Sequence, residues 1–234
     1  MNDRIAVVAG GSGYIGREIV NELAEQGCRV ISVSKTAFSP PEINECIDFI
    51  QGDMTSPAQI NSVIERVVKQ YGHIDILINT IGKNINCELD EITDEIWSDV
   101  INSNMKSVFF LCKIAGKEMQ KNSSGIIINF ASTAGIKALP QSPHYIAAKA
   151  GVIAMTQYFA KIYAPLVRVN CIAPGFVLTK NHKPESYASY EAVVQKIPMK
   201  RMAPVNEVVN STIYLIDSPT ITGHTLVIDG GLIL

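Results

Sequence analysis

Short, continuous apolar runs recur along the chain and alternate with longer segments in which apolar residues return about every 3.6 positions. Continuous runs are typical of parallel strands that are covered on both faces, whereas half-exposed strands alternate between apolar and polar residues. The pattern therefore predicts a parallel sheet. Its seven expected strands are Ile5–Ala9, Val30–Val33, Asp48–Gln51, Ile76–Ile78, Ile126–Phe130, Val167–Ile172 and Leu226–Ile228, of which Asp48–Gln51 has the weakest pattern.

The amphipathic segments between these strands predict helices, and residues that commonly cap helices lie at their ends. Gly27 follows the first segment, and Ser56, Pro57 and Gln59 can cap the second, with Gln59 completing a capping box. Because strand and helix alternate throughout, we expect one α/β domain, residues 1–234, with a doubly wound Rossmann fold and helices on both faces of the sheet. The expected helices are Tyr14–Gln26, Pro57–Tyr71, Thr93–Gln120, which the pattern leaves open to an interruption, and His144–Tyr163.

Two segments depart from this alternation. Residues 36–45 contain Pro40 and Pro41, so we expect a loop or a single turn there instead of a full crossover helix. Residues 179–206 are polar and proline-spaced, without clear periodicity. Long insertions in compact domains often cover a site. We therefore expect residues 179–206 to form a substrate lid within the single domain.

Composition narrows the class of protein. The 234 residues are 47% apolar and 18% charged, which is ordinary for an enzyme with one large core. A net charge of −2 gives no reason to expect a nucleic-acid partner. No apolar run is long enough to cross a membrane, and the N-terminal run is too short for a signal peptide. We expect neither a nucleic-acid nor a membrane partner.

The cysteines and histidines carry no recognisable ligand spacing. Five cysteines are scattered without a C-x-x-C pair, a pattern that suits reduced thiols and predicts a cytoplasmic protein. Four histidines are equally scattered. Structural and catalytic metal sites need clustered ligands. The sequence therefore predicts no metal site.

A glycine-rich stretch, AGGSGYIG, lies between the first expected strand and the first expected helix. It places Gly10, Gly13 and Gly16 in the spacing G-x-x-G-x-x-G. Glycines at such a turn let backbone N–H groups approach a pyrophosphate at the helix N-terminus. The alternative is a tight turn with no ligand. The strand before it and the helix after it favour a dinucleotide cofactor.

The end of the second strand bears on which dinucleotide is bound. A carboxylate at this place holds the ribose hydroxyls of NAD and repels the 2′-phosphate of NADP. Here the sequence has Ser34, Lys35 and Thr36, with no acid. Lys35 can pair with a phosphate and the two hydroxyls can hydrogen-bond it. We therefore prefer NADP(H), with NAD(H) as the alternative in which Lys35 is only solvated.

Tyr145 and Lys149 are four positions apart in an expected helix, so they lie on one face. An ammonium near a phenol favours the phenolate and lowers the pKa of the tyrosine. A tyrosine tuned in this way can act as a general acid or base. The spacing alone is weak evidence, because a solvated lysine beside a tyrosine gives the same pattern.

Together these stretches resemble the short-chain dehydrogenase/reductases, in their single-domain branch, over nearly the whole chain. The resemblance is carried by AGGSGYIG, GDMT, NTIG, INSNMKSVFF, INFASTAG, HYIAAKAG, APGFVLT, IPMKRMAP and ITGHTLVIDGG, in the order typical of the family. Three positions depart from the family pattern: Tyr14 replaces a glycine, Thr80 an asparagine and Ile81 an alanine. The basic residue that many NADP-binding members carry in the glycine loop is also missing, which weakens the preference for NADP.

The resemblance implies four catalytic residues. Tyr145 is the expected acid in reduction and base in oxidation, and Lys149 is expected to bind the nicotinamide ribose and to lower the pKa of Tyr145. Ser132 is expected to hydrogen-bond the substrate oxygen, and Asn104 to hold a water that connects Lys149 to solvent. His144 points to another side of the helix, where it can touch substrate or a second subunit, but a surface position is the favoured expectation.

The same resemblance implies the residues that hold the cofactor. Asp53 is expected to contact the adenine, and Val177 and Thr179 the carboxamide of the nicotinamide. The full expected set is Gly10, Ser12, Gly13, Tyr14, Ile15, Gly16, Ser34, Lys35, Asp53, Met54, Asn79, Gly82, Tyr145, Lys149, Pro174, Gly175, Val177 and Thr179.

These residues imply an oxidoreductase that transfers a hydride between NADP(H) and a ketone or secondary alcohol. The likeness is greatest to 3-oxoacyl-carrier-protein-reductase-like members, so a 3-oxoacyl thioester or another small carbonyl compound is the expected substrate. One alternative is an NAD-dependent sugar, polyol or alcohol dehydrogenase. Another is a sensor or scaffold that binds NADP without turnover. Members of this branch are usually homotetramers or homodimers, so we expect a homo-oligomer.

Overall fold

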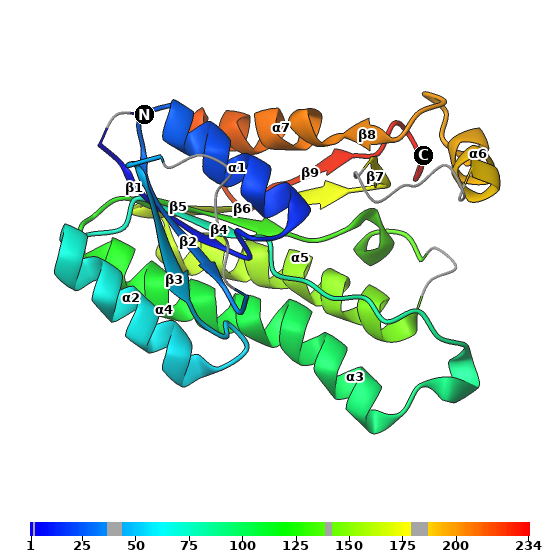
Figure 1. The fold of residues 1–234 in the computed structure, drawn as a ribbon, viewed down its shortest axis with the longest axis horizontal. Coiled ribbons are helices and arrows are strands. Elements are labelled where there is room, and N and C mark those ends of the chain that lie inside the picture. The colour runs from blue at the N-terminus through cyan, green and yellow to red at the C-terminus, as the bar shows by residue number, and fades with distance from the viewer. Residues whose placement is uncertain (2, 37–43, 139–141, 179–186) are drawn as a thin grey trace.

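A seven-stranded parallel sheet forms the middle layer of the protein (Figure 1). The structure, a computed structural model, describes residues 1, 3–36, 44–138, 142–178 and 187–234. The strand order is β3-β2-β1-β4-β5-β6-β9, and all pairs are parallel, which confirms the predicted doubly wound fold. The strands are β1 (Ile5–Ala9), β2 (Arg29–Ser34), β3 (Ile47–Gln51), β4 (Ile76–Asn79), β5 (Gly125–Phe130), β6 (Val167–Pro174) and β9 (Thr225–Ile228).

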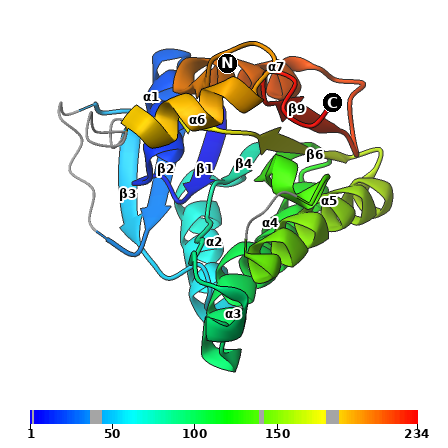
Figure 2. The same ribbon diagram turned by 90° about the vertical axis from the view of Figure 1, so that its right-hand side faces the viewer.

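Helices cover both faces of this sheet. Figure 2 shows α1 and α7 above the sheet and α2 to α5 below it, whereas α6 lies at the right-hand end of the molecule in Figure 1, beside the C-terminus. Alternate residues of β1 belong to different cores: Ala6 and Val8 pack with α1 and α7, whereas Val7 and Ala9 pack with α2, α4 and α5. Burial on both faces explains the continuous apolar runs. The helices are α1 (Tyr14–Glu25), α2 (Pro57–Tyr71), α3 (Asp94–Ile101), α4 (Ser107–Lys121), α5 (Pro143–Tyr163), α6 (Tyr187–Lys196) and α7 (Val205–Asp217).

The long helical region after residue 93 is interrupted, as the sequence pattern left open. Its middle, Asn102–Lys106, forms a π-helical turn between α3 and α4. Such π turns are rare and occur often at functional sites. Asn104 lies within this turn and is fully buried, so the interruption aims a polar side chain inward.

The chain reverses its direction of travel across the sheet between β1 and β4. From β1 it proceeds to β2 and β3 on one side, and from β4 to β5 and β6 on the other. Ligands of doubly wound sheets bind at such a switch point, outside the carboxyl ends of the strands. Here Gly10 follows β1 at φ +89° and lies against Thr80, which follows β4. The approach is so close that a Cβ on Gly10 would lie 2.7 Å from Thr80 Oγ1.

The segment predicted as a lid is only partly described. The structure places α6 and the short strand β8 (Ala203–Pro204) within it, and β8 pairs with β7 (Val177–Leu178). The sequence pattern predicted none of these three elements. Two residues are too few to show a strand period, and α6 has only weak amphipathicity. The expectations for residues 37–43 and 179–186 lie outside the described residues.

Candidate active site

Two adjoining pockets, of about 320 and 450 Å³, lie at the carboxyl ends of the strands. Gly13, Thr80, Gly82 and Lys83 line both, so the pockets form one cleft. The smaller pocket lies over β1, β2 and β3, and the larger reaches β5, β6 and α5. The predicted site residues that line the cleft are Gly10, Ser12, Gly13, Tyr14, Ile15, Gly16, Ser34, Lys35, Asp53, Met54, Gly82, Ser132, Tyr145, Lys149, Pro174, Gly175 and Val177.

The glycine turn brings the start of α1 close to β1. A Cβ on Gly16 would lie 2.3 Å from the carbonyl oxygen of Gly10, so only glycine fits there. Among the described residues no side chain caps the N-terminus of α1, and Gly13, Tyr14 and Ile15 at its start line the larger pocket. Free N–H groups and the helix dipole make this turn suited to an anion. The residues present therefore fit the pyrophosphate of a dinucleotide.

Ser34 anchors the glycine turn to β2. Its hydroxyl accepts from the backbone N–H of Ser12 at 2.9 Å and donates to the carbonyl oxygen of Val33 at 2.8 Å. The side chain is 6% exposed. This hydroxyl lines the smaller pocket and is already hydrogen-bonded within the protein, so its contact with a 2′-phosphate stays a prediction.

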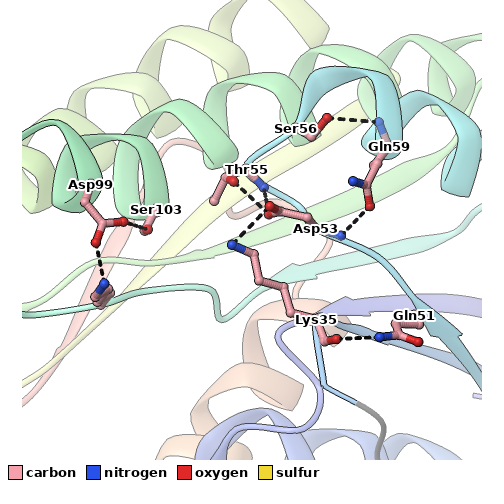
Figure 3. A network of polar contacts seen from close by, with 9 residues as sticks. Lys35, Gln51, Asp53, Thr55, Ser56, Gln59, Asp99 and Ser103 are labelled. Carbon is pink, nitrogen blue, oxygen red and sulfur yellow. Dashed lines mark hydrogen bonds and ion pairs between the residues drawn. The ribbon is translucent and has the colours of Figure 1, made fainter. Parts of the chain in front are cut away.

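Lys35 and Asp53 meet at the edge of the smaller pocket (Figure 3). Lys35 Nζ lies 3.0 Å from Asp53 Oδ2, and Thr55 donates to Asp53 Oδ1 from both its backbone and its hydroxyl. Partial burial raises the pKa of Asp53, but the bonds from Thr55 and Lys35 outweigh it, so the pKa lies below its ordinary value. Gln59 accepts from the backbone N–H of Asp53 instead of completing the predicted capping box.

Asn79 does not line the cleft. Its side chain is fully buried beneath the sheet, where Nδ2 donates to Asn129 Oδ1 at 2.7 Å. Asn129 in turn donates to Thr156 on α5. The side chain of Asn79 therefore joins β4 to β5 and α5, and a contact of this residue with the cofactor stays a prediction.

Tyr145 and Lys149 lie together in the larger pocket, as the sequence predicted. Lys149 Nζ is 5.6 Å from the centroid of the Tyr145 ring and donates to the carbonyl oxygen of Phe130 at 2.9 Å. Ser132 follows β5, and its hydroxyl accepts from the N–H of Ala134. The helix α5 and the end of β5 thus place a phenol, an ammonium and a hydroxyl in the larger pocket.

The ionisation of this pair differs from the prediction. Burial raises the pKa of Tyr145, and a hydrogen bond with Ser132 only partly offsets the effect. Burial lowers the pKa of Lys149 from 10.5 to about 8. Desolvation dominates the pKa of Tyr145, so its net direction is opposite to the expected one, and the effect of Lys149 on the phenolate stays a prediction. A raised pKa keeps the proton on the phenol at neutral pH.

Asn104 lies behind the cleft wall. Its Nδ2 donates to the carbonyl oxygens of Lys83 and Val100, at 2.7 and 2.9 Å, and its Oδ1 accepts from the N–H of Lys83 at 3.3 Å. A Cβ on Gly82 would lie 2.8 Å from Asn104 Oδ1 and 3.2 Å from Lys149 Nζ. The π turn therefore holds the segment that follows β4 against Lys149.

His144 is not on the surface, so that prediction is wrong. Its side chain is fully buried, and Nε2 lies 3.1 Å from the carbonyl oxygen of Ile85. Helical spacing gave the direction of the side chain relative to Tyr145 correctly. It could not show that the segment after β4 and Trp97 of α3 cover that side of the helix.

Sequence reasoning missed several residues that line the cleft. Thr80 and Lys83 could have been predicted, since they follow a predicted strand and residues at the carboxyl ends of parallel strands line the site in this fold. Ser103 could not have been predicted, because the π-helical turn sets the direction of its side chain and helical periodicity does not predict such a turn. Thr179 lies outside the described residues. The additional residues include Val33, Gly52 and Thr55 beside the ends of β2 and β3, Thr80, Ile81, Lys83, Asn84 and Ser103 after β4 and in the π turn, and Phe130 and Ala131 at the end of β5.

No group of three or more histidine, cysteine, aspartate or glutamate side chains is arranged to hold a metal ion in the part of the chain that the structure describes. Among the helices that the structure describes, none is both long enough and apolar enough to cross a membrane.

Comparisons with known proteins agree with this geometry. A family model described as enoyl-(acyl carrier protein) reductase matches residues 9–233. The 3-oxoacyl-[acyl-carrier-protein] reductase FabG of Escherichia coli strain K12 is 32% identical over 236 residues, which cover 98% of this chain and 97% of that protein.

Two solved structures superpose closely. The short-chain dehydrogenase of Leptospira borgpetersenii with bound NAD+ has a TM-score of 0.93 and 30% identity, covering 100% of this chain and 94% of that one. The structure of ElxO with NADP bound has a TM-score of 0.91 and 29% identity, covering 99% of each chain. Both were solved with a nicotinamide dinucleotide.

Proposed function

The chain belongs to the short-chain dehydrogenase/reductase family and is an NAD(P)-dependent oxidoreductase, and from this premise we propose that it reduces a 3-oxoacyl thioester with NADPH. The single observation that carries the reaction type is that the phenol of Tyr145, the hydroxyl of Ser132 and the ammonium of Lys149 line the same pocket. A proton donor is what carbonyl reduction needs at the oxygen. The thioester substrate is supported by likeness to a 3-oxoacyl-carrier-protein reductase.

The proposed chemistry divides between cofactor and protein. When bound, the reduced nicotinamide supplies a hydride to the carbonyl carbon. Tyr145 donates its phenolic proton to the carbonyl oxygen, and Ser132 hydrogen-bonds the same oxygen and orients it. Lys149 binds the nicotinamide ribose and stabilises the phenolate that remains after proton transfer. Asn104 holds Lys83 and Gly82 against Lys149, which fixes this wall of the pocket.

The proposed cofactor contacts follow the two halves of the cleft. The first turn of α1 binds the pyrophosphate, and Asp53 and Met54 line the adenine end. Pro174, Gly175 and Val177 line the nicotinamide end. Lys35 supports a preference for NADPH, because it is the cation of the smaller pocket nearest the end of β2. The carboxylate of Asp53 competes with a bound phosphate for the charge of Lys35.

Absorbance at the wavelength of the reduced cofactor tests the proposal directly. Purified protein is mixed with NADPH and acetoacetyl-coenzyme A, a soluble 3-oxoacyl thioester, and the loss of NADPH is followed. We expect turnover that depends on both compounds and is slower with NADH. Turnover only with an aldose and NAD+ would support a sugar dehydrogenase instead, and absence of turnover with any carbonyl compound would support a non-catalytic binding protein.

We also propose that the protein is a homo-oligomer that associates through α4 and α5. The support is apolar surface on and after α5: Tyr158, Ile162 and Leu166 are 59%, 45% and 38% exposed. Contiguous exposed apolar residues are typical of protein interfaces. Light scattering of purified protein is expected to give a multiple of 25.5 kDa. A monomeric mass at working concentrations would contradict it.

A further inference from the structure

His144 occupies an unusual place for a titratable residue. It directly precedes Tyr145 at the start of α5, and its side chain is fully buried. Nε2 faces the carbonyl oxygen of Ile85 at 3.1 Å. Because a carbonyl only accepts, Nε2 carries the hydrogen of this bond, and Nδ1 is left as the other ring nitrogen. That Nδ1 is buried and has no partner among the described residues.

The same carbonyl receives a second donor from the start of α5. The hydroxyl of Ser142 lies 3.0 Å from the oxygen of Ile85. Two side chains that flank Pro143 thus converge on one backbone atom of the segment after β4. A carbonyl has two lone pairs, so both bonds can form together.

This segment is held at both ends. Asn104 binds the backbone N–H and the carbonyl oxygen of Lys83, and Ser142 and His144 bind Ile85 two residues later. Gly82, Lys83 and Asn84 line the pocket that holds Tyr145. The bonds to Ile85 therefore fix the distance between the catalytic helix and the opposite wall of the pocket.

Trp97 keeps the histidine in this position. The two rings pack edge to face, with centroids 6.3 Å apart and an angle of 61° between their planes. Trp97 comes from α3, so the imidazole lies between α3 and the segment after β4. The ring is joined to this segment by the hydrogen bond from Nε2 to the carbonyl oxygen of Ile85.

We propose that His144 is a positioning residue for the reaction: through its bond to Ile85 it sets the wall formed by Gly82 to Asn84 against Tyr145. The proposal rests on the proposed carbonyl reduction. It goes beyond it because the imidazole lines neither pocket and acts through the backbone of Ile85. It predicts that kcat depends on the hydrogen bond, whereas cofactor affinity does not.

Two variants separate the bond from the space that the ring fills. In H144Q the amide nitrogen lies about where Nε2 lies in histidine, so the bond to Ile85 can form. In H144N the shorter side chain places its amide near the position of Nδ1, and the bond is lost. We expect kcat with NADPH and acetoacetyl-coenzyme A to fall about tenfold in H144N, the factor that one lost hydrogen bond gives, and to stay within about threefold of wild type in H144Q. The Kd for NADPH, from fluorescence titration, is expected to be unchanged in both.

A second readout does not depend on turnover. Trypsin cleaves after lysine, so the rate of cleavage after Lys83, followed by mass spectrometry, reports how firmly the segment is held. We expect faster cleavage in H144N than in wild type or H144Q. Equal kcat in all three proteins, or equal losses in both variants, would overturn the proposal, as would equal cleavage rates. If the wild-type protein turns over no carbonyl compound, the proposed function fails, and the cleavage rates alone decide whether the tether exists.

Discussion

Lys35 and Asp53 form an ion pair across the carboxyl ends of β2 and β3, with Nζ 3.0 Å from Oδ2. The lysine side chain is 61% exposed and the aspartate side chain 30% exposed. In the sequence, Lys35 stands alone at the end of its strand and indicates a phosphate site. In the structure, its charge is shared with a carboxylate that also lines the pocket, so the choice of cofactor depends on the pair.

Replacing Asp53 with Asn should raise the preference for NADP+ over NAD+. The amide keeps the oxygen that accepts from Thr55 but removes the charge that competes for Lys35. Exposed ion pairs contribute up to about 1 kcal/mol, so the ratio of kcat/KM values should rise up to about fivefold. The control is K35A, which should lower the same ratio and make it less sensitive to salt. An unchanged ratio in both variants would show that this pair does not select the cofactor.

Replacing Tyr145 with Phe should abolish most turnover. The ring remains and only the proton donor is lost, so kcat should fall about 10²-fold to 10⁴-fold while the Kd for NADPH stays within about twofold. Y214F is the matched control, because Tyr214 lies on α7, lines neither pocket of the cleft and is 57% exposed. If Y145F keeps most of its activity, Tyr145 is not the acid.

Replacing Lys149 with Met should stabilise the protein while removing its activity. The pKa of Lys149 lies at about 8 in the folded protein, against 10.5 ordinarily. Between about pH 8 and pH 10.5 the unfolded chain holds this proton and the folded protein does not, so stability rises with pH in this window. Below about pH 8 both the folded and the unfolded protein hold the proton, and burial of this charge lowers the free energy of unfolding by about 3 kcal/mol.

Urea unfolding measures this effect. K149M loses its bond to Phe130, so we expect a gain of about 2 kcal/mol in the free energy of unfolding at pH 7, shrinking toward pH 10.5. The control is K161M, which changes an exposed lysine on the same helix. A gain that is absent at pH 7, or that grows with pH, would contradict the assigned burial cost.

Replacing Gly16 with Ala should disrupt the glycine turn, whereas replacing Gly13 should not. The new Cβ at position 16 would lie 2.3 Å from the Gly10 oxygen, a backbone atom that cannot move aside. At position 13 the nearest atom is the same oxygen at 3.2 Å. We expect G16A to lose about 2 kcal/mol of stability and G13A less than about 1 kcal/mol, measured by thermal unfolding. Equal losses would mean that the close approach at Gly16 is not what requires glycine.

The sequence predicted most elements because their signals are local. The buried run of β1 and the caps of α2 follow from the period of apolar residues and from the chemistry of Ser56 and Pro57. The pocket positions of Ser132, Tyr145 and Lys149 were also predictable, since the resemblance is carried by short motifs in a fixed order.

What the sequence determined by itself was the layout: a parallel sheet, its covering helices, and a glycine turn and a Tyr–Lys pair at the carboxyl ends of the strands. The tertiary structure alone decided the surroundings of individual side chains. It buried His144 against Ile85, turned Asn79 into the core, and brought Asp53 to Lys35. It also decided the direction of the pKa of Tyr145. The physical reason is that burial and electrostatics depend on which distant segments meet, whereas periodicity reports only how one segment divides between core and solvent.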